Sequence, residues 1–195
     1  MKENNALRQA VFIVALANLG YFFIEFVAAL HIGSVSLFAD SIDFLEDASV
    51  NLLIFFALAW SVTMRAKAGM VMAGFIVIPA IATLWAVWQQ IMGQQPPIAA
   101  SLSLVGLGAL IVNLSCALLL TKFRHHSGSL TKAAFLSARN DAFANIAIIA
   151  TGFVTMAYPS IWPDIVVGLA IAAMNADAAR EVFETARTEH KGAKA

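Results

Sequence analysis

The chain has 195 residues, of which 61% are hydrophobic and 12% are charged, and its mean hydropathy is +0.80. A soluble domain carries about a quarter charged residues, so this composition excludes a soluble protein and indicates a membrane protein. The net charge is zero with no Lys/Arg-rich run, which gives no sign of a nucleic-acid partner, and the single cysteine, Cys116, excludes a disulfide framework and a cysteine-rich zinc site.

Six apolar segments of about 20 or more residues follow one another, each long enough for a hydrocarbon core about 30 Å thick. In chain order they cover residues 9–31, 35–62, 69–92, 98–121, 130–157 and 163–183. Turn-forming stretches such as Ser127-Gly128-Ser129 and Pro159 to Pro163 separate them. We therefore predict an all-α membrane protein, a six-transmembrane-helix bundle over residues 9–185. Residues 1–8 and 186–195 are predicted as short cytoplasmic ends, without a soluble C-terminal domain.

The basic residues predict the orientation of this bundle. Eleven of the twelve lie on the same side of the bundle as the two termini. Because basic residues favour the cytoplasmic side, we predict a protein of the cell membrane with both termini in the cytoplasm. The exception is Arg139, inside the fifth segment.

The second segment contains four acids within eight residues: Asp40, Asp43, Glu46 and Asp47. An acid within lipid is costly, so such residues face a cavity, an ion or a partner. Asp43 and Asp47 are four residues apart and share one face of a helix, which suits two oxygen ligands of a divalent cation. At ~1.5 Å per residue they lie about 12–18 Å below the outer surface. Asp141, in the fifth segment, lies roughly 17 Å above the inner surface, so the three acids meet near the midplane.

Other polar residues in the segments are interpreted as structural. Asp40 is expected to bond the backbone or a neighbouring helix, and Glu46 to pair with Arg139. Asn18, Glu25 and Asn145 are interpreted as contacts between helices. His125 and His126 are interpreted as solvated loop residues, the alternative being that they pass metal to the pathway.

A family resemblance follows from these residues. The stretch Ser34-Val-Ser-Leu-Phe-Ala-Asp-Ser-Ile-Asp-Phe-Leu-Glu-Asp47, preceded by Asn18 and Glu25, resembles the first two spans of the cation diffusion facilitator family. The resemblance implies six spans, a homodimer, and export of zinc or related divalent cations in exchange for protons. It also implies a site of two ligands four residues apart on each of the second and fifth spans. Asp43 and Asp47 match the first pair, and Asp141 matches one member of the second.

The chain departs from the family pattern in the second pair. The family places His or Asp where this chain has Ser137, a weak neutral ligand. Asn140 is the alternative for completing the shell. The predicted metal ligands are therefore Asp43, Asp47, Asp141, Asn140 and Ser137. The family's cytoplasmic metal-binding domain has no counterpart after the sixth segment.

These features predict a divalent metal efflux transporter, a metal/proton antiporter that works by alternating access. It is a secondary transporter and not an enzyme, with no tightly bound cofactor. The resemblance favours Zn²⁺ as substrate, whereas an oxygen-rich ligand set favours Mn²⁺, Fe²⁺ or Mg²⁺. The alternative is a non-transporting metal sensor or partner subunit in the membrane.

Overall fold

A computed structural model of the chain describes residues 2–57, 64, 81–122 and 128–192. None of these residues is in a β-strand, so the predicted all-α class is confirmed. The helices are α1 (Lys2–Ile32), α2 (Val35–Ala57), α4 (Ala99–Thr121), α5 (Gly128–Ala157) and α6 (Trp162–Gly192), with a further helical segment at residues 81–93.

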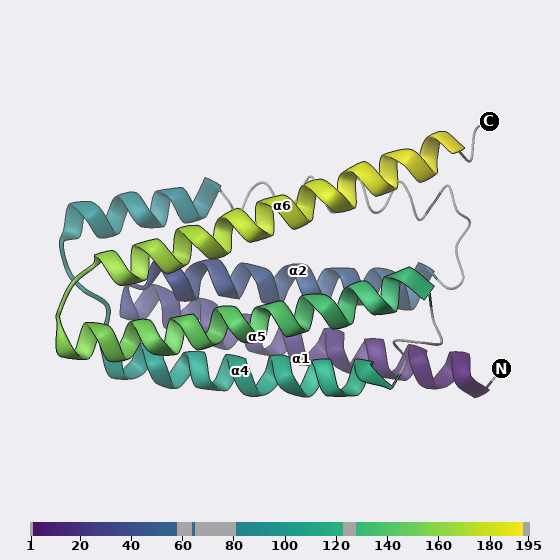
Figure 1. Ribbon diagram of the computed structural model, residues 1–195, viewed down its shortest axis with the longest axis horizontal. Helices are drawn as coiled ribbons and strands as arrows, with labels where there is room; N and C mark the ends of the chain where they lie inside the picture. Colours follow the sequence, from purple (N-terminus) through teal and green to yellow (C-terminus); the bar gives the residue numbers. More distant parts are fainter. Residues whose placement is uncertain (1, 58–63, 65–80, 123–127, 193–195) are drawn as a thin grey trace.

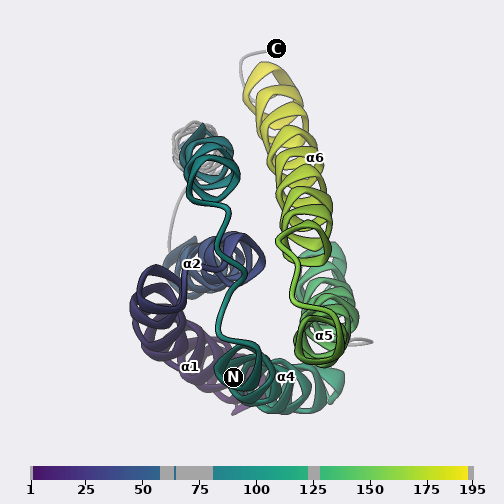
Figure 2. The ribbon, with the colours of Figure 1, turned by 90° about the vertical axis from the view of Figure 1, so that its left-hand side faces the viewer.

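The helices run side by side along the long axis of the molecule (Figure 1). α1 packs along α2, and α4 packs along α5. α6 contacts both α2 and α5. Seen end-on, α2, α1, α4 and α5 follow an arc, and α6 and the segment 81–93 extend from its two ends (Figure 2). The start of α1 and the end of α6 lie at the same end of the bundle (Figure 1), as an even number of crossings requires.

The surface of this bundle is apolar in the way that a lipid environment requires. Within the described residues, three helical stretches are long and apolar enough to cross a membrane: Asn5–Ile32, Ala99–Thr121 and Asn140–Ala157. Large apolar side chains point outward from them, including Phe23 and Val27 on α1 and Leu104 and Leu118 on α4. In α2 the four acids interrupt an otherwise apolar helix. The chain is therefore an all-α membrane bundle.

Several boundaries differ from the predicted ones: α1 begins at Lys2, within the predicted cytoplasmic end of residues 1–8, and α6 continues to Gly192, past the predicted end of its span at residue 183. α5 begins at Gly128, inside the stretch predicted as a break. α6 begins at Trp162, before the predicted end of the break at Pro163. Proline suits this place because the first turn of a helix has no intrahelical partner for its N–H groups. Most of the predicted third span lies outside the described residues, which include only its part from residue 81 onward.

The interior has three layers along the bundle axis. One apolar cluster, near the start of α1, joins Val11 and Val14 to Ile54, Cys116 and Leu120. A second cluster at the opposite end brings α1, α2, α4, α5 and α6 together. Its members are Ala29, Ile32, Leu37, Ala39, Leu102, Ile148 and Ile171. Between the two clusters lie the buried polar residues Asn18 and Glu25 of α1, Asp40 and Asp47 of α2, and Asn113 of α4.

The ends of α1, α2, α6 and the segment 81–93 meet at one fully buried acid, Asp164. Its carboxylate accepts hydrogen bonds from the backbone N–H groups of Val35 (2.7 Å) and Ser36 (3.2 Å), and thereby caps the N-terminus of α2. The hydroxyls of Ser34 (2.7 Å) and Ser36 (2.5 Å) donate to the same carboxylate. Gln90 Nε2 donates to it at 2.9 Å and also to the carbonyl oxygen of Gly33 at 2.9 Å. We call this arrangement the Asp164 cap.

Candidate metal centre

The polar layer of the interior brings the predicted acids of α2 and α5 together. The side chains of Asp43 and Asp141 lie close enough to interact directly, and Asp47 interacts electrostatically with Asp141. Asp47 and Asp141 are 8% and 7% exposed, and Asp43 is partly buried. The two helices that carry these acids are separated by α4 in the sequence and are in contact in space. The predicted meeting of α2 and α5 at one depth therefore agrees with the structure.

Amide groups from other helices orient the two α2 acids. Asn18 Nδ2 on α1 donates to Asp47 Oδ2 at 3.3 Å, and the Cys116 thiol on α4 donates to Asn18 Oδ1 at 3.6 Å. Asn175 on α6, with its amide nitrogen turned toward its acceptors, donates to Asp43 Oδ1 at 3.0 Å and to the Ile171 carbonyl at 3.1 Å. Five helices thus contribute to the surroundings of these carboxylates.

The acids retain capacity for a further ligand. Asp141 Oδ2 is buried and has no hydrogen-bond partner among the described residues, and the same holds for Glu46 Oε2. A buried carboxylate oxygen without a donor is unfavourable by about 1–3 kcal/mol or more, so it favours a cation or a proton. Among the described residues, no three His, Cys, Asp or Glu side chains converge tightly enough to enclose a metal ion. The arrangement therefore presents an acid pair with a third acid nearby, which would have to draw together around an ion.

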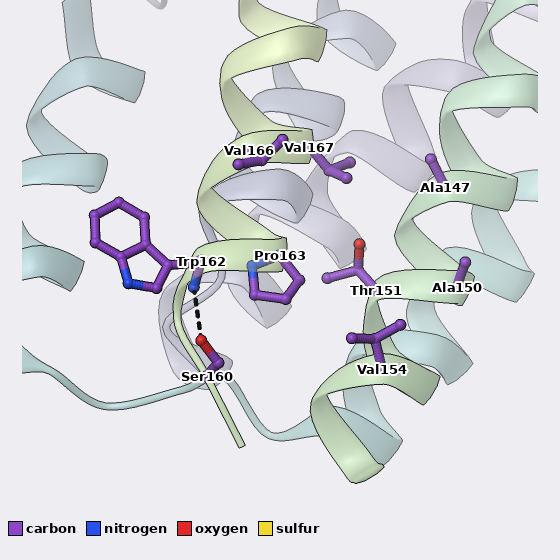
Figure 3. A pocket seen from close by; sticks show the side chains of 9 residues that line it. All are labelled: Ala147, Ala150, Thr151, Val154, Ser160, Trp162, Pro163, Val166 and Val167. Carbon is purple, nitrogen blue, oxygen red and sulfur yellow. Dashed lines mark hydrogen bonds between the residues drawn. The ribbon is translucent and has the colours of Figure 1, made fainter. Parts of the chain in front are cut away.

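A separate groove lies between α5 and α6 near the turn that joins them (Figure 3). It is lined chiefly by apolar side chains, among them Val154, Trp162 and Val166, and its polar members are Thr151 and Ser160. Because these residues offer no charged ligand, the groove does not suit a metal ion. None of the buried acids of α2 and α5 lines this groove.

The family model of the cation efflux transmembrane domain matches residues 11–189, which is most of the chain. This protein belongs to the cation efflux family. No curated protein matches the chain. Membership makes the chain a membrane transporter of metal cations and not an enzyme. The match begins in α1 and ends in α6, so it includes all the helices that surround the acids of this cation efflux protein.

The remaining predicted ligands of the cation efflux protein are both on α5. The backbone of Ser137 is helical, but its side chain lies outside the described residues. Asn140 has an exposed side chain that takes part in an interaction. The predicted pair of Glu46 and Arg139 and the predicted roles of His125 and His126 also lie outside the described residues.

The predicted structural residues form a chain of amides beside the acids. Asn113 Nδ2 on α4 donates to Asn145 Oδ1 at 3.0 Å, and Asn145 Nδ2 on α5 donates to Asp40 Oδ2 at 2.6 Å. Asp40 therefore bonds a neighbouring helix, as predicted. The contact of Asn175 with Asp43 was not predicted. The sequence does place a polar residue, Asn175, in the sixth span. Whether its side chain faces α2 depends on how α6 is rotated in the bundle, which the sequence does not give.

Proposed function

We propose that this transporter exchanges a divalent metal ion, with Zn²⁺ as the favoured substrate, for protons by alternating access. Asp43, Asp47 and Asp141 act as its metal ligands. One observation carries the proposal: acids from two helices far apart in the sequence interact inside a layer flanked by apolar clusters. Acids within a membrane-spanning bundle are costly unless they serve an ion, a proton or a partner.

Carboxylate chemistry links the metal to protons. A carboxylate binds a metal only when it is deprotonated, so metal and protons compete for the same oxygens. When the centre is open to the cytoplasm, the metal displaces protons. When it is open to the other side, protons displace the metal. The unpartnered Oδ2 of Asp141 is available to either ligand.

A further oxygen ligand to the metal would come from α5. Ser137 lies one helical turn before Asp141 and therefore shares its face, whereas Asn140 is about 100° around the helix. We propose Ser137 and Asn140 as alternative sources of the additional oxygen ligand. Both are neutral, so the net charge of the bound centre depends on the three acids.

A second candidate substrate class is a harder cation, Mn²⁺, Fe²⁺ or Mg²⁺. The observation that favours it is that the acids brought together, Asp43, Asp47 and Asp141, offer only carboxylate oxygens, while Asn18 and Asn175 donate hydrogen bonds to two of them. Oxygen ligands suit these cations, whereas imidazole and thiolate favour zinc. Family resemblance keeps Zn²⁺ as the first choice.

We also propose that the chain is a homodimer in the cell membrane with both termini in the cytoplasm. The orientation rests on the positive-inside distribution of Lys and Arg. The dimer rests on family resemblance alone. The alternative function, a membrane metal sensor or partner subunit, differs from a transporter in binding metal without moving it.

The test is metal flux into proteoliposomes that contain the purified chain alone, with and without a proton gradient. We expect gradient-dependent flux from the wild type and none from Asp43→Ala or Asp141→Ala, because each loses a charged ligand. Glu184→Ala, which removes an exposed surface acid, is the matched control and should transport normally. Wild-type flux in either acid variant would contradict the site. Metal binding without flux in the wild type would support the sensor.

A further inference from the structure

A second pair of acids lies beside the metal centre and is even more deeply buried. Glu25 on α1 and Asp40 on α2 are both 0% exposed, and their side chains lie close enough to interact. In the part of the chain that the structure describes, neither oxygen of Glu25 has a hydrogen-bond partner, and neither does Asp40 Oδ1. Three carboxyl oxygens are therefore buried without a donor. This condition is unfavourable in the interior of a membrane protein unless a cation or a proton is present.

The pair is distinct from the metal ligands. Asp40 precedes Asp43 by three residues, about 4.5 Å along the helix axis. It thus lies nearer the end of the bundle at which α1 turns into α2. The titratable groups that act electrostatically on the pair are Tyr21 from α1, Asp43 and Asp47 from α2, and Asp141 from α5. In the described part of the chain, no basic side chain forms an ion pair with either acid.

Asparagine hydrogen bonds distinguish the two members of the pair. Asn145 accepts from Asn113 through Oδ1, so it must present its NH₂ group to Asp40 Oδ2. An NH₂ donor stabilises Asp40 as a carboxylate. Glu25 has no donor of this kind among the described residues. The natural arrangement is a protonated Glu25 that donates its O–H to the carboxylate of Asp40.

We propose that Glu25 and Asp40 together hold one exchangeable proton, at a site separate from the metal ligands, and that metal binding expels this proton electrostatically. The inference rests on the proposed function. A divalent ion between Asp43 and Asp141 adds positive charge close to the pair, which stabilises its fully ionised form. The proton then leaves for water, and the net charge of the pair changes from −1 to −2. When the proton returns, it weakens metal binding by the same coupling.

The first experiment counts protons released per metal ion bound, in detergent with a pH indicator. We expect Glu25→Gln, which is uncharged whether or not metal is bound, to release one proton fewer than the wild type. Asp40→Asn should behave in the same way. Glu184→Gln, at the surface, is the matched control and should release the wild-type number. Equal proton release from Glu25→Gln and the wild type would overturn the proposal.

The second experiment separates coupling from transport in proteoliposomes. Metal–metal exchange at equal pH and saturating metal should be within about twofold of the wild type in Glu25→Gln, because the metal ligands are intact. Stimulation by a proton gradient should fall about fivefold or more, the scale of a typical coupling free energy. Full gradient stimulation in Glu25→Gln would contradict the inference. If the wild type shows no flux at all, the proposed transport function fails. The number of protons released per metal ion bound then still tests whether Glu25 and Asp40 hold a proton.

A third measurement applies if the variants fail to fold. The infrared difference spectrum of the wild type on adding Zn²⁺ should lose a carbonyl band of a protonated carboxylic acid. No such loss would overturn the proposal. Binding of a second metal ion per chain that depends on Glu25 would also overturn it, because the pair would then be a metal site.

Discussion

Ser137 is the residue at which this chain departs from the cation diffusion facilitator pattern, since it offers a hydroxyl in place of His or Asp. It lies on α5 one turn from Asp141. A hydroxyl is a weak neutral ligand, so under the proposed site the identity of this one side chain would bear directly on which metal is preferred.

Ser137→His should increase the preference for Zn²⁺ over Mn²⁺ about tenfold, which equals about 1.4 kcal/mol, because imidazole suits zinc better than manganese. The measurement is thermal stabilisation of the purified protein by each metal, since a ligand that binds only the folded state raises its stability. Ser137→Asp is the control, and it should strengthen the binding of both metals. An unchanged zinc-to-manganese ratio in Ser137→His would exclude this position from the metal shell.

Depth along the helix axis could be predicted for the acids of α2 and α5. Asp43 and Asp141 were expected at the same level because each helix advances by a fixed rise per residue from a known side of the membrane. The contact of Asn175 with Asp43 could not be predicted, since it depends on the rotation of α6 against α2. The contact of Glu25 with Asp40 was not predicted either, since it depends on the rotation of α1 against α2.

At the level of elements, α2 and α6 are joined by the Asp164 cap and by a close approach of their backbones. A Cβ added at Gly168 would lie 2.8 Å from the carbonyl carbon of Val35 and 2.9 Å from the backbone nitrogen of Ser36. Backbone atoms cannot yield as a side chain can. α6 therefore depends on a glycine at this crossing.

Gly168→Ala should lower stability by about 1–3 kcal/mol, the usual effect of overpacking. Gly20→Ala is the matched control, because nothing lies within 4 Å of a Cβ at that position. The control should be neutral or stabilising by up to about 1 kcal/mol, since alanine is the better helix former. Thermal unfolding in detergent would measure both. Equal stability of the two variants would contradict the close crossing.

Asp164→Asn should lower stability by about 2 kcal/mol or more, because it replaces a charged acceptor that receives several donors. The new NH₂ group would face the N–H of Val35 or another donor of the Asp164 cap. Asp177→Asn, at an exposed position of α6, is the control. An unfolding temperature for Asp164→Asn equal to that of the wild type would show that the cap contributes little.

For the whole molecule, the sequence predicted the class and the positions of most helices, because span length and apolar composition follow from the thickness of the bilayer. Helix ends were less predictable. α5 and α6 both begin inside stretches of turn-forming residues, where Gly128 and Pro163 are tolerated in a first helical turn. The arc of helices in Figure 2 was not predicted, since it depends on which apolar faces meet.

The predicted orientation can be tested with single cysteines. Cys116 is the only cysteine, and it is buried, so Cys116→Ala provides a background free of thiols. In that background, Asn5→Cys should react with a membrane-impermeant thiol reagent only after the cells are opened. Gln95→Cys, in the turn before α4, should react in intact cells. The reverse pattern would invert the topology and the proposed direction of transport.

The Asp164 cap also has a consequence for the order in which the chain is synthesised. The N-terminus of α2 is made early, but the carboxylate that satisfies its N–H groups belongs to the last helix. Until that helix enters the membrane, Val35 and Ser36 must bond to water or lipid headgroups at the edge of the bilayer. A nascent chain stopped before residue 164 would therefore hold its first hairpin without this cap, and the hydrogen bonds at the start of α2 would be completed only when α6 is made.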